Sequence, residues 1–159
     1  MPDVLVGIAL GSNMGDRNAE LDAGISLLRL VAVKREVHES PRIETMPVNC
    51  PPGSAMFLNS VAVMEVDSVT FPPLNLFGCL EEFEYERGRC PLREVNSPRP
   101  LDLDIIFYGI ERFDHMGLII PHPRAHVRRF VLEPLSHLQP DLILPGQTKT
   151  VRQLLVDLA

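Results

Sequence analysis

Two aspartates, Asp102 and Asp104, are the residues of this sequence whose type and spacing are best suited to chemistry. Side chains alternate between the two faces of a strand, so these carboxylates project together, about 7 Å apart along the backbone. Carboxylates on one face repel each other unless a cation lies between them. Magnesium prefers a few carboxylates together with substrate phosphates, and phosphoryl-transfer enzymes often hold two such ions. The pair therefore indicates a metal-assisted phosphoryl-transfer site, with a solvated polar face on a half-buried strand as the alternative.

Arginines gather around the acidic pair. Arg99 stands between two prolines just before Asp102, and its planar guanidinium is suited to phosphate oxygens. The only lysines of the chain are Lys34 and Lys149. One stretch holds most of the basic residues, namely Arg87, Arg89, Arg93, Arg99, Arg112, Arg124, Arg128 and Arg129. A general bias toward arginine explains a high total but not this clustering, so we expect phosphate binding near the aspartates.

An aromatic residue and an amide share one face of a predicted strand. Phe57 and Asn59 are two residues apart, so the ring can stack on a flat heterocycle while the amide offers donors and an acceptor to its edge. The alternative is a core phenylalanine beside a strand-edge asparagine. Gly11-Ser12-Asn13, between a strand and a helix, is either a phosphate-binding turn or an ordinary capped turn, and it lacks the lysine of a P-loop.

The segment from Pro121 to Phe130 is rich in polar donors. His122 and His126 have the spacing of a metal-binding pair, but no third ligand is evident, which argues against zinc. Contact with phosphate or a nucleotide suits His122 and Arg128 better, and Phe130 is either a second stacking ring or part of the core. No serine or cysteine has the setting of a nucleophile.

The elements that must position these residues follow from apolar periodicity and cap residues. Apolar runs predict strands at residues 4–10, 31–40, 57–66 and 101–108, with a short strand at 118–120. Helical spacing and caps predict a helix after residue 16, a second over 72–88, helical turns over 124–137 and a last helix from Thr150, where Gln153 completes a capping box. Irregular segments lie between them, at 41–55 and 89–100. Strands and helices in mixed order indicate an α+β sandwich.

Composition limits the class of protein. The 159 residues suit one domain over 1–159, and with 45% hydrophobic and 23% charged residues the chain is globular. The net charge of −6 argues against non-specific nucleic-acid binding. We expect no membrane span and no signal peptide, and three scattered cysteines indicate reduced thiols in the cytoplasm.

Five segments, in order and spacing, resemble the 6-hydroxymethyl-7,8-dihydropterin pyrophosphokinase family of the folate pathway. The five segments are Gly11–Asn13, Phe57–Asn59, Gly88–Arg89, Pro98–Asp104 and Pro121–Phe130. They extend over nearly the whole chain, and the last two together are highly specific. The resemblance implies an α+β, ferredoxin-like sandwich, whose antiparallel central sheet is flanked by helices and long catalytic loops. It also implies a monomeric cytoplasmic enzyme that transfers pyrophosphate from ATP to the hydroxymethyl group of the pterin and releases AMP.

The resemblance also implies roles for individual residues. Asp102 and Asp104 hold two magnesium ions that bridge the phosphates of ATP, and Asp102 lies near the attacking hydroxyl. Arg89 and Arg99 neutralise phosphates and complete the catalytic set. The residues implied for ATP are Glu84, Arg89, Arg99, Ile105, His122 and Arg128. Those implied for the pterin are Thr45, Val48, Phe57, Asn59, Asp102 and Phe130, with the two phenylalanines stacking on the ring and Asn59 and the backbone around Thr45 and Val48 reading its edge. Functional coupling to dihydropteroate synthase is implied as well; nucleic acid and membrane are not.

Two segments depart from the family pattern, and two other functions stay open. Residues 90–96 lack the aromatic residue and some of the basic residues of many members, for which Arg93 is a partial substitute, and Met46-Pro47 stands where two prolines are frequent. A phosphotransferase or nucleotidyltransferase with the same acidic pair would release ADP or inorganic pyrophosphate instead of AMP. A ferredoxin-like sensor would bind its ligand without turnover.

Overall fold

An antiparallel sheet in the order β2-β4-β1-β5 organises the chain, and β3 continues from β2 along the same edge of β4. The computed structural model describes residues 3–46, 53, 55–88 and 100–159. The strands are β1 (Asp3–Ser12), β2 (Val37–Glu39), β3 (Ile43–Thr45), β4 (Phe57–Asp67), β5 (Asp102–Tyr108) and the separate hairpin β6 (Phe113–His115) and β7 (Leu118–Ile120). The helices are α1 (Arg17–Val31), α2 (Pro73–Glu86), α3 (Arg129–Leu138) and α4 (Val151–Asp157), with single 3-10 turns η1 (Val33–Arg35) and η2 (Ala125–Val127).

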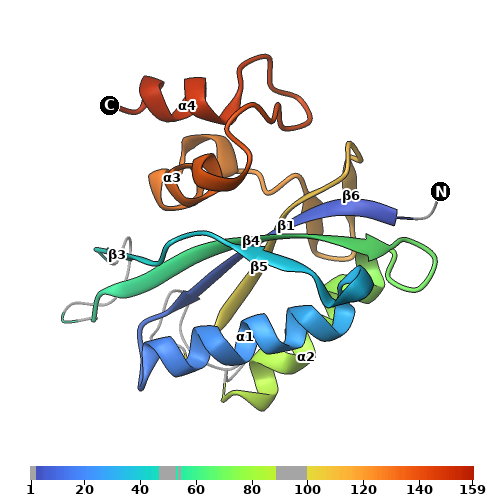
Figure 1. Ribbon diagram of the computed structural model, residues 1–159, viewed down its shortest axis with the longest axis vertical. Coiled ribbons are helices and arrows are strands. Elements are labelled where there is room, and N and C mark those ends of the chain that lie inside the picture. The colour runs from blue at the N-terminus through green and yellow to red at the C-terminus, as the bar shows by residue number, and fades with distance from the viewer. Residues whose placement is uncertain (1–2, 47–52, 54, 89–99) are drawn as a thin grey trace.

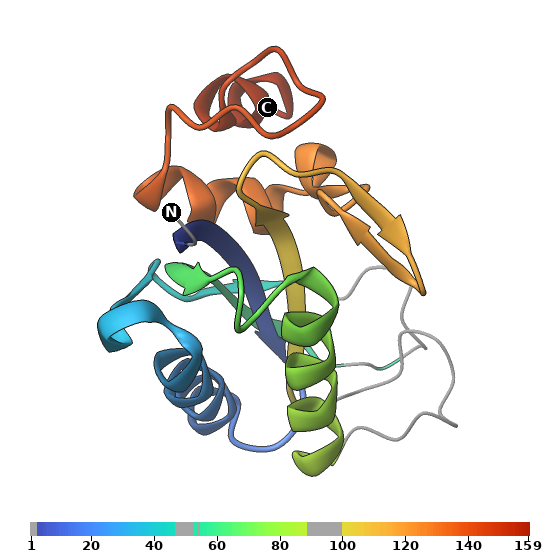
Figure 2. The same ribbon diagram turned by 90° about the vertical axis from the view of Figure 1, so that its right-hand side faces the viewer.

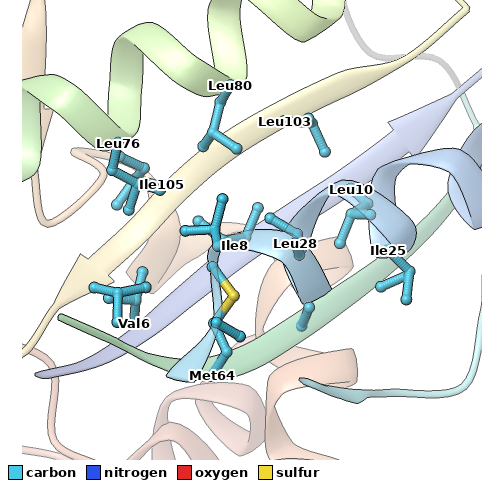
Figure 3. Close-up of a cluster of buried hydrophobic side chains, with 14 of the residues drawn as sticks. Val6, Ile8, Leu10, Ile25, Leu28, Met64, Leu76, Leu80, Leu103 and Ile105 are labelled. Atoms are coloured by element: carbon cyan, nitrogen blue, oxygen red, sulfur yellow. The ribbon is translucent and has the colours of Figure 1, made fainter. Parts of the chain in front are cut away.

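Helices cover both faces of the sheet, so the fold has three layers. Figures 1 and 2 show α1 and α2 on one face and α3 on the other, with α4 packed on the outer side of α3. The strands supply apolar side chains to both faces, because the side chains of a central strand alternate between two cores. Figure 3 shows the core under α1 and α2, where Ile8 and Met64 of the sheet pack with Leu28 and Leu80 of the helices. A second core joins the other face of the sheet to α3, and α3 to α4.

A β-bulge in β5 interrupts this alternation. Ile8 pairs with Ile105, but Gly7 pairs with Phe107, so Ile106 is an extra residue. Ile106 and Phe107 consequently both enter the core under α3, and Tyr108 returns to the core under α1 and α2. Gly7 is required opposite the bulge, because a Cβ there would collide with the ring of Phe107.

The predicted caps are confirmed at the helix ends. The side chain of Asp16 accepts a hydrogen bond from the Ala19 N–H (3.0 Å), and Pro73 opens α2. Gly88 follows α2 with a φ of 108°, a conformation that favours glycine. Thr150 and Gln153 form the complete capping box of α4.

Three predicted element boundaries are wrong. The strand expected over 31–40 is only β2, because the apolar stripe of α1 continues to Val31 and a 3-10 turn follows. Gly11 and Ser12, expected in a turn, continue β1 because they pair with Asn59 and Leu58. The loop expected over 41–55 contains β3.

The hairpin partner of β7 was not predicted. β6 joins β7 through Met116 and Gly117, whose φ angles of 53° and 83° suit a tight hairpin turn. Within the described ranges, no helix is both long enough and apolar enough to cross a membrane.

Candidate active site

The candidate site lies on the sheet face that carries α3, at the end of the sheet where β3, β4, β1 and β5 run side by side. One row of paired residues across it reads Asp102, Gly11, Asn59 and Ile43, and the next reads Asp104, Ala9 and Val61. Val61 belongs to the core under α3, whereas none of the residues in the row that begins with Asp102 is part of that core. The sheet thus places polar side chains on the part of this face that the second core does not fill.

The two aspartates share this face, as predicted. Both are half-buried, whereas Leu101, Leu103 and Ile105 between and beside them are buried in the opposite core. Opposite the pair on β1 stand only Gly11 and Ala9. Ala9 is small and only partly buried, whereas the side chains of Asn59 and Phe57 lie over Gly11.

Glu84 of α2 holds the strand between the two aspartates. It is only 4% exposed, and its carboxylate accepts a hydrogen bond from the Leu103 N–H at 2.6 Å. β5 is the edge strand of the sheet, and this bond satisfies a backbone donor that points away from β1. Glu84 therefore contacts the backbone of the acidic pair from the side of α2.

His122 approaches the aspartates from the segment after β7. Its backbone N–H donates to the Ile106 carbonyl (2.8 Å), which fixes this segment against β5. Burial, then the nearby Arg128, lower the pKa of His122 to about 4, although Asp102 acts in the opposite direction. The imidazole is neutral at pH 7, and its Nδ1 accepts a hydrogen bond from the Arg124 N–H at 3.2 Å. The remaining proton is therefore on Nε2, which makes that nitrogen a donor.

Arg128 adds a cation to the same place. Burial lowers the pKa of its guanidinium, while Asp104 and, less strongly, Asp102 raise it. The guanidinium carbon lies 5.3 Å from the centre of the Phe130 ring, a cation–π contact. Phe130 itself is half-buried at the start of α3 and packs on the second core. The structure thus brings Asp102, Asp104, His122 and Arg128 together, as predicted.

A cleft of about 240 Å³ runs along the outer edge of β5. It is bounded by α2, β5, the β6–β7 hairpin and the segment after it, through Phe77, Leu103, Asp104, Ile105, Gly117, Leu118, Ile119, His122 and Pro123. The backbone of Ile105 points away from β1 into this cleft, because it is two residues from Leu103, whose N–H does so. The cleft joins an apolar wall to Asp104 and His122, a combination suited to a nucleoside with a charged tail.

The predicted pterin-side residues gather on β3 and β4. Phe57 and Asn59 share the site face, and the Thr45 hydroxyl donates to Asn59 Oδ1 at 2.6 Å. The amide nitrogen of Asn59 then lies over Gly11, where a Cβ would be 3.1 Å from it. Thr45, expected to act through its backbone, thus also orients the Asn59 amide.

The donor set fits magnesium. No group of three His, Cys, Asp or Glu side chains with metal-binding geometry occurs among the residues that the structure describes. Two half-buried carboxylates on one face suit an ion that takes few protein ligands and completes its shell with phosphate oxygens and water.

Some predicted site residues lie outside the described residues. These are Val48, Arg89 and Arg99, together with the divergent segment 90–96. Sequence reasoning also missed residues that build the site. The alternating small residues Gly7, Ala9 and Gly11 were available as a signal. The hydrogen bonds made by Arg42, described below, had no local signal at all.

Comparison with known proteins agrees with this geometry. The family model for 7,8-dihydro-6-hydroxymethylpterin-pyrophosphokinase, abbreviated HPPK, matches residues 7–140. A Pseudomonas aeruginosa protein named 2-amino-4-hydroxy-6-hydroxymethyldihydropteridine pyrophosphokinase is 36% identical over 88% of this chain and 83% of its own length. An Arabidopsis thaliana protein named folate synthesis bifunctional protein is 39% identical over 84% of this chain, which spans 26% of that longer protein.

Solved structures show the same fold. A crystal structure of a Plasmodium falciparum HPPK-DHPS protein with pteroate superposes with a TM-score of 0.72 at 14% identity. The match covers 98% of this chain and 43% of that one, and it identifies the α+β, ferredoxin-like sandwich. By its family model and its relatives, this chain belongs to the 7,8-dihydro-6-hydroxymethylpterin-pyrophosphokinase family and is an enzyme of that family, a pyrophosphokinase.

Proposed function

We propose that this enzyme transfers the pyrophosphate group of ATP to 6-hydroxymethyl-7,8-dihydropterin in folate biosynthesis. The hydroxymethyl oxygen forms a bond to the β-phosphorus of ATP, the bond from that phosphorus to the α–β bridging oxygen breaks, and AMP leaves with that oxygen. The hydroxyl proton is released. The observation that carries the proposal is the juxtaposition, on one sheet face, of the acidic pair of β5 and the Phe57–Asn59 platform of β4.

Asp102 and Asp104 would hold two magnesium ions with the phosphates of ATP. Bound there, the metal neutralises phosphate charge and polarises the β-phosphoryl group. The carboxylates are suited to this role because they share a face next to Ala9, a small and only partly buried residue. Asp102 is in the same row of paired residues as Asn59, whereas Asp104 is in the next row. The pterin hydroxyl therefore attacks from the side of Asp102.

ATP binds along the edge of β5. The Nε2–H of His122 and the guanidinium of Arg128 contact its phosphates, and Arg89 and Arg99 neutralise further phosphate charge. The nucleoside occupies the cleft beside β5, where the backbone of Ile105 reads its polar edge. Glu84, which also belongs to this end of the site, acts through the Leu103 N–H and keeps the acidic pair in place.

The pterin binds on β4. Its ring stacks between Phe57 and Phe130, a use of aromatic side chains that favours a flat heterocycle. Asn59, with the backbone around Thr45 and Val48, reads the polar edge of that ring. Phosphoryl transfer of this kind depends on positioning and charge neutralisation, so no strong general base is required.

Residues 1–159 form one pyrophosphokinase domain that acts as a cytoplasmic monomer without nucleic acid or membrane. Functional coupling to dihydropteroate synthase is part of the proposal, since one relative is named as a bifunctional folate synthesis protein and the solved neighbour is an HPPK-DHPS protein. In that setting the pterin diphosphate is handed to the next enzyme.

Phosphorus NMR of one reaction tests the proposal. Purified protein is incubated with ATP, magnesium and 6-hydroxymethyl-7,8-dihydropterin, and parallel samples omit the pterin or the magnesium. AMP and a pterin diphosphate should form in the complete sample alone. ADP would identify an ordinary kinase, and pterin binding without turnover would identify a sensor; either result overturns the proposal.

A further inference from the structure

Arg42 uses all five N–H donors of its guanidinium within the protein. Nε and Nη2 each donate a hydrogen bond to the carboxylate of Glu39, at 2.9 and 3.2 Å. Nη2 donates a second hydrogen bond to the carboxylate of Asp22, at 2.7 Å. Nη1 donates to both the backbone and the side-chain oxygen of Asn18 (3.2 and 2.9 Å). The arginine just before β3 is therefore held by the end of β2 and by the first turns of α1. We call this set, Arg42 with Asn18, Asp22 and Glu39, the Arg42 clamp.

The clamp reaches the strand that carries the proposed pterin platform. The Glu39 carboxylate also accepts a hydrogen bond from the Ser60 hydroxyl (2.7 Å), and Ser60 is the neighbour of Asn59 on β4. The side chains of Arg42 and Glu39 are only 20% and 21% exposed, so the bonds of Glu39 to Arg42 and Ser60 are partly sheltered from water. Ser60 and α1 belong to the opposite face from Asn59, so the clamp acts from behind the site.

The clamp holds a bulge that decides which way β3 faces. Glu39 pairs with Ala62 and Ile43 pairs with Asn59, so Ser40, Pro41 and Arg42 oppose only Ser60 and Val61. One extra residue on this side inverts the alternation of the strand that follows. Without it, Thr45 would point to the face of α1; with it, Thr45 points to the face of Phe57 and Asn59.

Ser40 pairs with the backbone of β4 inside the bulge. The Ser40 N–H donates to the Val61 carbonyl (2.9 Å), and the Ser40 hydroxyl accepts from the Val61 N–H (3.0 Å). The backbone of β4 is therefore paired through the irregular stretch, and the side chain of Arg42 supplies its lateral attachment to α1. The two arrangements together specify one register for Ile43–Thr45.

We propose that Arg42 is a positioning residue for pterin recognition, which fixes the register of β3 and thereby sets Thr45 against Asn59. The inference rests on the proposed function for its ligand. Arg42 touches no substrate: it acts through the bulge, and the Thr45–Asn59 hydrogen bond is the part that meets the pterin. A salt bridge that merely added stability would affect the two substrates alike.

Two variants and one control test the role of Arg42. Arg42→Met removes the guanidinium group, and Arg42→Lys retains its charge alone. The control, Arg29→Met, removes an exposed arginine from the last turn of α1, the helix that Arg42 contacts. We expect Arg42→Met to weaken pterin binding about tenfold, the scale of one lost hydrogen bond, and to change binding of α,β-methylene-ATP less than about twofold. Arg42→Lys should restore only part of the pterin affinity, because an ammonium cannot fill the place of the guanidinium group. Equal weakening of both ligands, or no weakening, overturns the proposal.

A double-mutant cycle tests the route through Thr45. Thr45→Val should weaken pterin binding in the otherwise unchanged protein and have a much smaller effect when combined with Arg42→Met, because the hydroxyl is then already misplaced. Fully additive effects would show that Arg42 does not act through Thr45.

Amide hydrogen exchange keeps the inference distinct from the proposed function. In Arg42→Met the amides of Ile43–Thr45 should exchange faster, while those at the centre of β1 keep their protection. If the unchanged protein binds no pterin, the proposed function and the pterin role both fall, and the exchange data still decide whether Arg42 holds the register. If the pterin binds and β3 exchange is unchanged, this inference alone is wrong.

Discussion

At His122, burial and two neighbouring guanidinium groups act on the imidazole in the same direction, and Asp102 opposes them. The neutral ring accepts one hydrogen bond from the Arg124 N–H, so it presents Nε2–H to the site. An imidazole in this state is able to donate a hydrogen bond to a phosphate oxygen without adding a charge next to Arg128. Beside the acidic pair, Arg128 therefore carries the positive charge, and His122 offers a directional hydrogen bond.

The titration of His122 is the first prediction at the scale of single residues. NMR of the imidazole should give a midpoint at about pH 4, and Arg128→Met should raise that midpoint because a nearby cation is removed. The unfolded chain binds the proton near pH 6.5, so His122 should cost stability progressively as the pH falls from about 6.5 to about 4. Urea midpoints of His122→Gln should vary less over that window. A midpoint near 6.5 in the folded protein would contradict the burial that the structure shows.

The acidic pair carries the second prediction. Asp104→Asn keeps the shape of the side chain but removes a charge that would face the metals, so AMP formation should fall by about 10³-fold or more. Pterin binding, followed by fluorescence, should change little because Asp104 lies a row away from Asn59. Asp114→Asn on the exposed β6 is the matched control and should retain full turnover. Turnover retained in Asp104→Asn would refute the metal assignment.

At the scale of elements, small residues and bulges shape the sheet that carries the site. Gly7 gives space to Phe107 at the bulge of β5, and Gly11 gives space to the Asn59 amide. Bulges of this kind re-aim side chains next to active sites. Here one of them directs Ile106 and Phe107 into the core under α3, and the other turns Thr45 toward Asn59.

A pair of glycine substitutions tests this account of the sheet. Gly7→Ala should destabilise the protein by about 1–3 kcal/mol, because the added methyl group meets the buried Phe107 ring. Gly78→Ala, in the exposed middle of α2 where nothing lies within 4 Å, should instead stabilise it by about 0.5–1 kcal/mol. Urea unfolding measures both, and equal effects of the two changes would argue against the tight packing at Gly7.

At the scale of the whole molecule, two cores share one sheet. The core under α1 and α2 (Figure 3) and the core that joins α3 and α4 to the sheet lie on opposite faces of β1, β4 and β5. Neither set of helices can leave without exposing strands on which the other depends. The site lies on the α3 face beside the second core, so its geometry depends on both layers.

Matched core truncations test this dependence. Leu28→Ala and Leu135→Ala each remove a fully buried side chain, one from each core, and each should cost about 2–5 kcal/mol. Both should lower the midpoint of the same single unfolding transition, observed by circular dichroism and by intrinsic fluorescence. Two separated transitions in either variant would show that the layers unfold independently.

Much of the fold and the centre of the site were predictable from local patterns. Alternation alone placed Asp102 and Asp104 on one face, a proline at the first helical position located the start of α2, and a capping box located that of α4. These features depend on residues a few positions apart, whose relation is set by the geometry of a strand or a helical turn. The roles of Arg89, Arg99 and Val48 stay predictions, because those residues lie outside the described ranges.

Only the tertiary structure decided the register of the strands and the partners of Arg42. A repeating pattern specifies which residues share a face, but it does not specify which residue of a distant strand lies opposite, nor where one extra residue inverts that pattern. The bulges at Ile106 and at Ser40–Arg42 result from pairings between segments far apart in the chain. Arg42 finds Asn18 and Asp22 only because α1 packs across β2 and β4. The sequence by itself therefore determined which polar residues share a strand face and where helices begin, and long-range packing determined how these parts face one another.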